Sequence, residues 1–421
     1  MLLNGLAGWS VGKGWGMKGN LRGWTVALAG LGVNLILGVL YAWSVMGKAL
    51  VVQWHWNKTQ AALPFAMSTA AFALTMVFAG RAQDKLGPRW VAMSGGILLG
   101  LGLALSALAH EPFLMVLTFG VVGGIGIGLG YCATTPAAVK WFPAARKGLI
   151  TGIVVSGVGL AAVYMSPLTQ WLLKTTDIPS TFLILGIGAA IVVALLAQLL
   201  RNPPADYQLV ARTVTAVPRA AAVSRRDVDW PGMLRTPQFY LLWLIYVLAA
   251  AAGLMIISNV AIIAKEQASW EAGFIPVMLL AAFNTLGRFG SGAISDRIGR
   301  TNTMVIAFVL QAVNMLLFLH YRTPLTVALG ASFTGVCYGA IFTLMPAATA
   351  DFYGLRNLGV NYGCVFTGFG VAGVLGSLLG GRVCDLLGSY SMAYTICAGM
   401  LVAAAVLAYA TRPPAERTAN A

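Results

Sequence analysis

Long apolar runs separated by short polar stretches repeat along the whole chain. Each run is about 20 residues long, the length that a helix needs to cross the hydrocarbon core of a bilayer. The short segments of strict alternation that characterise a transmembrane β-barrel are not seen in the sequence. The pattern therefore predicts an all-α integral membrane protein with twelve transmembrane helices. We expect these helices at residues 24–47, 59–80, 89–109, 113–138, 148–172, 180–200, 237–264, 271–294, 303–320, 324–349, 357–381 and 390–410.

Composition and charge support this class of protein. The chain is 59% hydrophobic and only 9% charged, whereas a soluble domain carries about 25% charged residues. A net charge of +15 could indicate a nucleic-acid partner, but its distribution follows the positive-inside rule. Only six Lys and Arg residues fall in the segments expected outside: Lys48, Lys58, Lys174, Lys265, Arg322 and Arg382. We therefore predict a multi-pass protein of the inner (plasma) membrane with both termini cytoplasmic, whose partner is the lipid bilayer and no nucleic acid.

A polar stretch, "RNPPADYQLVARTVTAVPRAAAVSRRDVDWPGMLRT", separates six predicted helices from six. It predicts two six-helix bundles joined by a cytoplasmic loop and flanked by two cytoplasmic tails. The expected units are the tail 1–21, the first bundle 22–200, the central loop 201–236, the second bundle 237–411 and the tail 412–421.

The two halves repeat each other's motifs. "GRAQDKLGPR" follows the second helix and "GAISDRIGR" follows the eighth, which places Asp84 and Asp296 212 residues apart; Pro136 and Pro346 lie 210 apart. Such a duplication predicts two pseudo-symmetric bundles. It is typical of a secondary carrier, whose substrate site lies between the halves near the midplane of the membrane.

These loops resemble the signature of the major facilitator superfamily. A longer stretch, "GLGYCATTPAAVKWFPAARKGLITGIVVSGVGLAA", resembles the oxalate–formate antiporter branch, which contains bacterial relatives of the monocarboxylate transporters. The similarity covers about residues 22–411. In the loops, charge pairs between helix ends can hold one state of a transport cycle. We therefore expect a cytoplasmic gate, which consists of Asp84, Arg89, Asp296 and Arg300.

An arginine lies inside the eighth predicted helix, in "FNTLGRFGSGAISDRIGR". Placing Arg288 in the hydrocarbon region costs at least about 2.5–3.5 kcal/mol. The side chain could snorkel to the inner surface, about 9 Å away along the helix. However, helical side chains lean toward the N-terminus of their own helix, so Arg288 should point toward the bilayer centre. Asn284, Ser291 and Ser295 fall on the same helix face and predict a polar, substrate-facing stripe.

Other helices offer polar and aromatic residues to the same site. Asn34 and Tyr41 lie seven residues apart in the first helix. The resemblance implies that tyrosines of the first, fourth and tenth helices line the site. Taken singly, each of these aromatic residues fits a packing role better than ligand binding. The predicted substrate-binding residues are Arg288, Asn284, Tyr41, Asn34, Tyr131, Tyr338, Tyr362, Phe366 and Phe369.

The charge count points to the ligand. All twelve acidic residues fall in loops or near helix ends, so the charge that compensates Arg288 must come largely from a substrate. A carboxylate offers arginine a bidentate, charge-assisted match. Oxalate carriers of the resembling branch carry a Lys in the eleventh helix, where this chain has Phe369. Because a second carboxylate would stay uncompensated, we predict a monocarboxylate such as lactate or pyruvate.

Coupling of transport to a second ion requires a residue that can carry that ion. Animal monocarboxylate transporters, which are similar, have an Asp at the position of Asn284, which cannot titrate. Glu266 and Glu271, between the seventh and eighth helices, could carry the proton instead, and Glu266 is the candidate that we single out. Alternatively, both belong to a solvated loop near Lys265. We predict proton-coupled symport by alternating access, with carboxylate exchange of the oxalate–formate type as the alternative. Both avoid moving an uncompensated anion against about 2.3 kcal/mol per 100 mV.

The sequence fits two further classes of protein less well. A membrane enzyme would need clustered catalytic groups, yet the three histidines, His55, His110 and His320, are scattered at outer helix ends. A channel or nutrient sensor on a carrier scaffold would lack saturable counterflow. We therefore expect no enzyme activity. We also expect no cofactor and no metal, and the five cysteines lack the spacing of a metal or redox site. The carrier is expected to work as a monomer.

Overall fold

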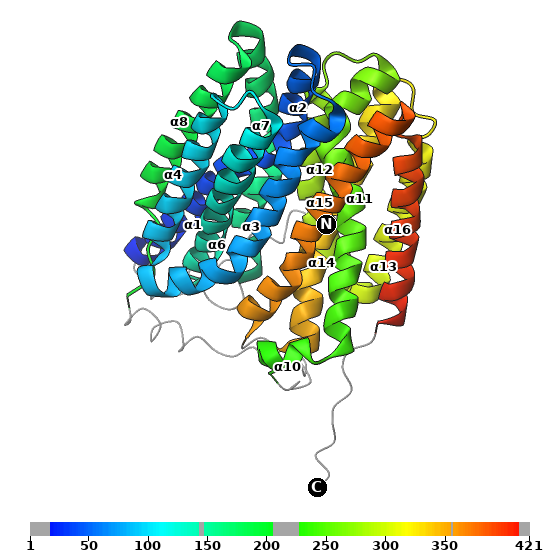
Figure 1. Cartoon of the computed structure of the whole chain (residues 1–421). Helices are drawn as coiled ribbons and strands as arrows, with labels where there is room; N and C mark the ends of the chain where they lie inside the picture. The colour runs from blue at the N-terminus through cyan, green and yellow to red at the C-terminus, as the bar shows by residue number, and fades with distance from the viewer. Residues whose placement is uncertain (1–16, 143–146, 205–226, 355–356, 412–421) are drawn as a thin grey trace, which may run out of the picture.

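The computed structural model describes residues 17–142, 147–204, 227–354 and 357–411. Within this part of the chain it contains twelve helices that are long and apolar enough to cross a membrane, and no strand. The all-α class and the number of spans predicted from the sequence are thus confirmed. The helices from α1 to α8 lie on one side of the molecule and those from α11 to α16 on the other (Figure 1).

The first six spans include two that are not regular α-helices throughout. The first span changes to a 3₁₀-helix, η1, and the fourth contains a π-helix, η2; neither interruption was predicted. In chain order the elements are α1 (Met17–Leu37), η1 (Gly38–Ala42) and α2 (Trp43–Gln53), then α3 (Lys58–Leu86), α4 (Pro88–Ser106), α5 (Pro112–Met115), η2 (Val116–Gly123), α6 (Gly124–Val139), α7 (Lys147–Thr175) and α8 (Ile178–Ala197).

The last six spans are continuous α-helices. A short helix, α10 (Trp230–Leu234), precedes them. They are α11 (Pro237–Ala268), α12 (Phe274–Ile298), α13 (Arg300–Leu317), α14 (Pro324–Tyr353), α15 (Leu358–Leu387) and α16 (Ser391–Ala410). The long helices α11, α14 and α15 extend several residues beyond the apolar runs predicted from the sequence.

The repeated loop motif has the same backbone conformation in both halves. One glycine joins α3 to α4, and another joins α12 to α13. Gly87 has φ +81° and Gly299 has φ +89°, a region that glycine adopts without steric cost. Each glycine is followed directly by the first residue of the next helix. The internal repeat predicted from the two loops is therefore also a repeat of local structure.

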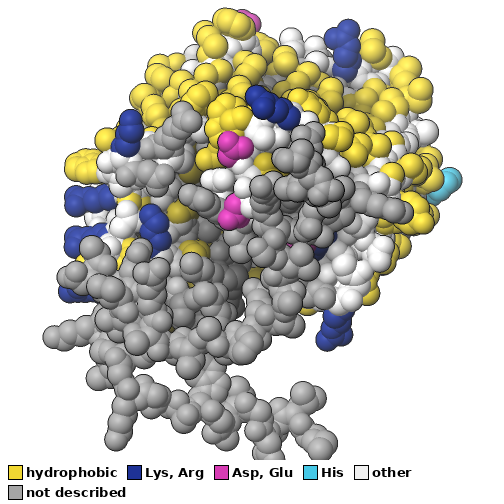
Figure 2. Space-filling view, turned by 90° about the horizontal axis from the view of Figure 1, so that it is seen from below, with side chains coloured by type: hydrophobic (Ala, Val, Ile, Leu, Met, Phe, Trp, Pro, Cys, Tyr) yellow, Lys and Arg dark blue, Asp and Glu magenta, His cyan; other side chains and the backbone are white. Residues whose placement is uncertain are grey.

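The two ends of the bundle differ in charge. We call the end at which α2 finishes the upper face and the end that carries α10 the lower face (Figure 1). Lys and Arg side chains lie around the rim of the lower face (Figure 2). Those described as exposed near this end include Arg22, Lys85, Lys140, Arg201, Arg235 and Arg297. Between the two faces the flanks expose large apolar side chains such as Leu74, Phe78 and Leu195, as a lipid-facing surface requires.

The halves meet along three helix pairs. α3 packs against α15, α7 against α12, and α2 against α11. The α3–α15 contact is close: a Cβ at Gly373 would overlap the Thr69 hydroxyl. Glycine is therefore needed at this position for the helices to approach.

Candidate functional site

Arg288 lies where α12 packs against α7. Only 8% of this residue is exposed. Its Nε donates to Asn284 Oδ1 at 3.1 Å, and Nη1 donates to the backbone carbonyl of Val155 at 3.2 Å. Asn284 is one turn closer to the start of α12. The guanidinium therefore leans away from the lower face, as predicted from helix geometry, and does not snorkel toward it.

Aromatic rings surround the guanidinium. Arg288 Cζ lies 4.6 Å from the centroid of the Phe342 ring, which places the cation over the negative face of the ring. The Tyr41 phenol lies beside Arg288, Asn284 and Tyr338, and the Tyr41 and Tyr338 rings meet edge to face at 6.4 Å. The structure thus brings Tyr41 and Tyr338, from opposite halves, to the arginine predicted to bind the substrate.

A second layer of rings extends from Phe342 into the second half. Phe369 lies 5.5 Å from Phe342 and stacks on Phe366 at 5.0 Å. Tyr362 in turn contacts Phe366 at 5.7 Å. One ring, Phe342, therefore separates Phe369 from Arg288.

The first half contributes to this layer through α3 and α6. The ring centroid of Phe72 lies 5.9 Å from that of Phe369 and 5.4 Å from that of Tyr131. Tyr131 also lies close enough to Arg288 for an electrostatic interaction. Tyr246 of α11 completes the cluster at 6.4 Å from Phe369. The predicted aromatic residues therefore belong to one connected group that spans both halves.

Sequence reasoning missed three members of this group, namely Phe342, Phe72 and Tyr246. Phe342 follows Tyr338 by four residues in α14, so helix periodicity places both on one face. That spacing could have identified it. Phe72 and Tyr246 lie in uniformly apolar runs and carry no comparable signal.

Unused hydrogen-bond donors point to the chemistry of the site. Asn284 Nδ2 and Tyr338 Oη are buried and have no hydrogen-bond partner. The Tyr41 phenol lies within hydrogen-bonding reach of Arg288, and no carboxylate among the described residues pairs with the guanidinium. Amide, phenol and guanidinium can all donate. A positive charge with unused donors is complementary to an anion with several acceptor oxygens.

Asn34 has different surroundings. It is fully buried, and its Nδ2 donates to the Val154 carbonyl at 2.8 Å. Its Oδ1 accepts from Thr134 Oγ1 at 3.3 Å. Both ends of the amide therefore connect α1 with α7 and α6, within the first half.

Glu266, the predicted coupling residue, lies at the upper face. Its Oε1 lies 2.6 Å from Lys58 Nζ, so it forms an ion pair between α11 and the start of α3. This contact differs from the solvated loop beside Lys265 that was the alternative from the sequence. Close by, Asp385 accepts hydrogen bonds from the backbone N–H groups of Lys58 and Thr59 at 2.9 and 2.7 Å.

The predicted gate at the lower face is only partly described. The side chains of Asp84 and Asp296 lie outside the described part of the structure. Arg89 places its guanidinium 5.4 Å from the ring centre of Trp90. Arg300 donates to Ser295 Oγ and lies 3.5 Å from Asp351 Oδ2, so these contacts are within the second half.

Neither a disulfide nor a metal site is found in the described residues. The five cysteines are free thiols. No group of three or more His, Cys, Asp or Glu side chains in the described part of the chain could hold a metal ion.

Comparison with known families decides the class of this fold. The chain matches the model of the Major Facilitator Superfamily over residues 23–324 and 271–421. The chain belongs to the major facilitator superfamily. Its twelve helices in two six-helix bundles are the fold of that family, so the resemblance noted in the loop motifs is confirmed.

Several relatives in the superfamily are transporters named for small carboxylates. The chain is 28% identical to the oxalate:formate antiporter of Oxalobacter formigenes, over 92% of this chain and 90% of that protein. It is 24% identical to monocarboxylate transporter 13 of Rattus norvegicus, over 90% and 87%. It is also 30% identical to YhjX, an uncharacterized MFS-type transporter of Escherichia coli, over 83% and 86%. These matches confirm the predicted branch, and the protein is a multi-pass membrane transporter.

Proposed function

We propose that this transporter carries small monocarboxylates of the lactate and pyruvate type by alternating access, and that Arg288 binds the substrate carboxylate. The observation that carries the proposal is a buried guanidinium with no carboxylate partner among the described residues. Removing a charge from water is costly unless it is paired. An incoming carboxylate supplies that pairing and leaves the site without net charge.

The free edge of Arg288 fits this ligand. Nε and one Nη1 proton bond within the protein, and the Tyr41 phenol also approaches the group. Because a guanidinium has five N–H donors, donors remain for two carboxylate oxygens. Tyr338 Oη and Asn284 Nδ2 are further unused donors, and Tyr41 lies beside them. A 2-hydroxy or 2-keto group next to the carboxylate has acceptor oxygens for these donors.

The aromatic layer favours a ligand with one charged end. Phe342, Phe366 and Phe369 form an apolar wall beyond the guanidinium, joined by Tyr131 and Tyr362. A short carbon chain can lie against this wall, whereas a second carboxylate there would lack a cation. This arrangement favours monocarboxylates over oxalate.

Sidedness follows from the charge distribution. We place the lower face, with its rim of Lys and Arg, in the cytoplasm and the upper face outside, in the inner (plasma) membrane. Both termini are then cytoplasmic, and bundles 22–200 and 237–411 rock against each other around Arg288. In this arrangement a single chain is the working unit. Asp84, Arg89, Asp296 and Arg300 would close its cytoplasmic side.

Glu266 is our candidate for coupling to protons. Its ion pair with Lys58 joins the halves at the upper face. Protonating Glu266 would remove one partner of this pair and weaken the closure on the outside, where a symported proton would arrive. Exchange of one carboxylate for another is the second candidate, favoured by the antiporter among the relatives and by Asn284, a residue that cannot titrate.

Uptake into proteoliposomes distinguishes the two modes of transport. Labelled lactate, pyruvate, formate and oxalate are offered to the purified protein with and without an inward pH gradient. Symport predicts that the gradient drives accumulation of lactate or pyruvate, and that Glu266→Gln reduces this effect more than it reduces exchange. Accumulation that requires internal carboxylate and ignores the gradient would establish exchange. Transport of none of these acids would refute the proposed substrate class.

A further inference from the structure

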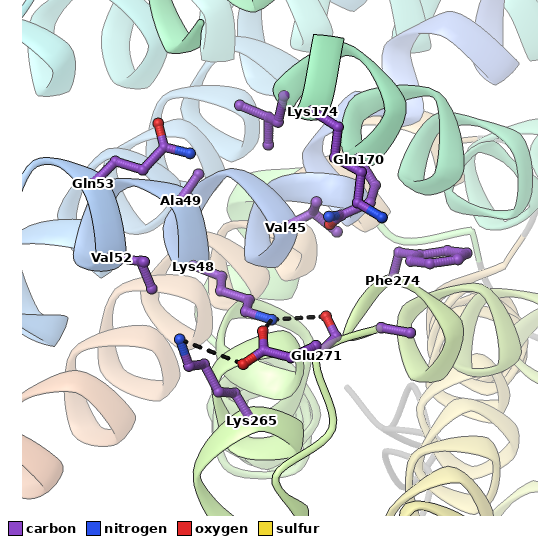
Figure 3. Close-up of a pocket in the computed structure, with 12 residues that line it drawn as sticks. Val45, Lys48, Ala49, Val52, Gln53, Gln170, Lys174, Lys265, Glu271 and Phe274 are labelled. Carbon is purple, nitrogen blue, oxygen red and sulfur yellow. Dashed lines mark hydrogen bonds and ion pairs between the residues drawn. The ribbon is translucent and has the colours of Figure 1, made fainter. Parts of the chain in front are cut away.

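A second group of cations lies at the upper face, far from Arg288. Three lysines, one from α2, one from α7 and one from α11, border a pocket of about 350 Å³. The pocket lies between the two halves (Figure 3). Lys48, Lys174 and Lys265 line this pocket together with one acidic residue, Glu271. The lining of this pocket therefore carries an excess of positive charge.

Glu271 pairs with two of these lysines in the present conformation, Lys48 and Lys265. One carboxylate oxygen lies 2.9 Å from Lys48 Nζ and the other 3.7 Å from Lys265 Nζ. Lys48 also donates to the backbone carbonyl of Glu271 at 2.8 Å. Lys174 makes no hydrogen bond or ion pair to any described side chain. A single carboxylate thus links lysines from opposite halves.

The Glu271 carboxylate is replaceable. Its side chain is 74% exposed, whereas that of Lys48 is only 12% exposed. Exposed ion pairs contribute little to stability, so an external anion can displace the glutamate while the lysine stays in place. The lining also includes four apolar side chains, those of Val45, Val52, Leu173 and Phe274. The site therefore offers cations for an acid group and apolar surface for a short carbon chain.

The location connects this pocket to the central site. Tyr41, which lies beside Arg288, precedes Lys48 by seven residues in the first span. This separation is about 10 Å along a helix. An anion in the upper pocket is therefore about two helical turns from the arginine.

We propose that the pocket of Lys48, Lys174 and Lys265 is a second, weaker binding site for small organic carboxylates, and that Glu271 occupies it when the upper face is closed. The ligand class rests on the proposed function. Binding at this site displaces Glu271 from Lys48, breaks a contact between the halves and thereby favours opening of the upper face. The substrate itself then acts on the closure before it reaches Arg288.

The test uses the full-length protein with the central arginine removed. Equilibrium binding of labelled lactate to purified Arg288→Ala is measured at low ionic strength. We expect weak residual binding that salt abolishes, because screening acts strongly on exposed charges. Adding Glu271→Gln should tighten this binding about tenfold, since the competing carboxylate is gone. Adding Lys174→Gln should weaken it about tenfold instead.

Lys140→Gln, an exposed lysine near the lower face, is the matched control and should leave residual binding unchanged. If neither Arg288→Ala nor Arg288→Ala/Glu271→Gln bound lactate, the proposal of an upper site would be wrong. The proposed role of Arg288 at the central site would be unaffected. The proposal of an upper site would also be wrong if neither Lys174→Gln nor Glu271→Gln changed the residual affinity for lactate. If Arg288→Ala alone kept the affinity and transport of the parent, the proposed function would fail instead, and the lysine variants would still report on the upper pocket.

Discussion

The molecule contains two kinds of buried or half-buried cation, and they differ in what surrounds them. Lys48 and Lys58 at the upper face each lie against a glutamate of the opposite half. Arg288 at the centre lies against a carbonyl, an amide oxygen and an aromatic ring. Breaking a pair that the protein itself supplies permits movement between the halves. A cation that the protein leaves without an anion is suited to take one from solution. We therefore propose that the lysines hold the upper face closed and that the arginine binds the substrate.

Removing the central cation tests the recognition side and has the largest expected effect. We predict that Arg288→Ala lowers lactate uptake at least 100-fold, because a buried charge-assisted pair with the substrate is lost, worth roughly 1.5–3 kcal/mol per hydrogen bond. Uptake into proteoliposomes at matched protein content measures this loss. Arg235→Ala, an exposed arginine at the end of α10, should transport like the parent. Wild-type uptake by Arg288→Ala would assign the arginine to packing.

A second cation at the centre should change the ligand. Phe369→Lys places an ammonium beside Phe342, one ring away from Arg288. One carboxylate no longer neutralises the site, so we predict at least a tenfold loss of monocarboxylate uptake and a gain of oxalate binding. Phe369→Leu keeps the site apolar and should retain lactate uptake within a few fold. Unchanged lactate uptake by Phe369→Lys would show that charge balance does not set the specificity.

Asn34 tests where the central site ends. Both of its amide ends bond within the first half, so Asn34→Ala leaves buried groups without partners. We predict a loss of about 1–3 kcal/mol in stability with an unchanged KM, read from thermal unfolding and from uptake by the folded fraction. A raised KM at unchanged stability would instead make Asn34 a substrate ligand, as the sequence pattern predicted.

The closure side responds to pH with a smaller effect. The hydrogen bond and the charge of Lys48, followed in importance by Lys265, lower the pKa of the Glu271 carboxyl below its usual range. A lowered pKa means that the pair contributes its stabilisation above the ordinary pKa of about 4.3 and loses it as pH falls through the lowered value. We predict that the labelling rate of Val45→Cys by a thiol reagent, divided by the rate of a free thiol at the same pH to remove the titration of the thiol itself, is constant from pH 8 to pH 5 and rises below about pH 4. Glu271→Gln should abolish this rise.

A rise that begins near pH 6 and is abolished by Glu271→Gln would contradict the lowered pKa of Glu271. It would then make this glutamate a candidate for proton coupling in the physiological range. The constant accessibility that we expect near neutral pH leaves that role to Glu266.

The comparison between the two kinds of cation was only half visible in the sequence. Arg288 stood out because an isolated charge interrupts an apolar run, and helix direction correctly predicted which way it leans. The twelve spans and the repeated glycine turns followed from run length and motif offset. These features are local, and the sequence displays them directly.

The pairing of the lysines could not be predicted in the same way. Lys58 and Glu266 are 208 residues apart in the chain, and they meet because α3 and α11 both pack against α15. Phe72 and Tyr246 were missed for the same reason, since an aromatic residue in an apolar run carries no sign of its neighbours. At Gly38, within the 3₁₀ segment η1, the first span lies close to α7, because a Cβ there would overlap Ala161. Such features arise from contacts between distant segments.

The central claim is that the charge of Arg288 is neutralised by the carboxylate of the substrate. Lactate and lactamide have nearly the same shape and differ in that charge, so their equilibrium binding to the purified parent and to Arg288→Ala isolates it. We predict that the parent binds lactate at least tenfold more tightly than lactamide, and that Arg288→Ala loses this preference. Equal binding of the two ligands by the parent, or a preference for lactate that survives in Arg288→Ala, would contradict the claim.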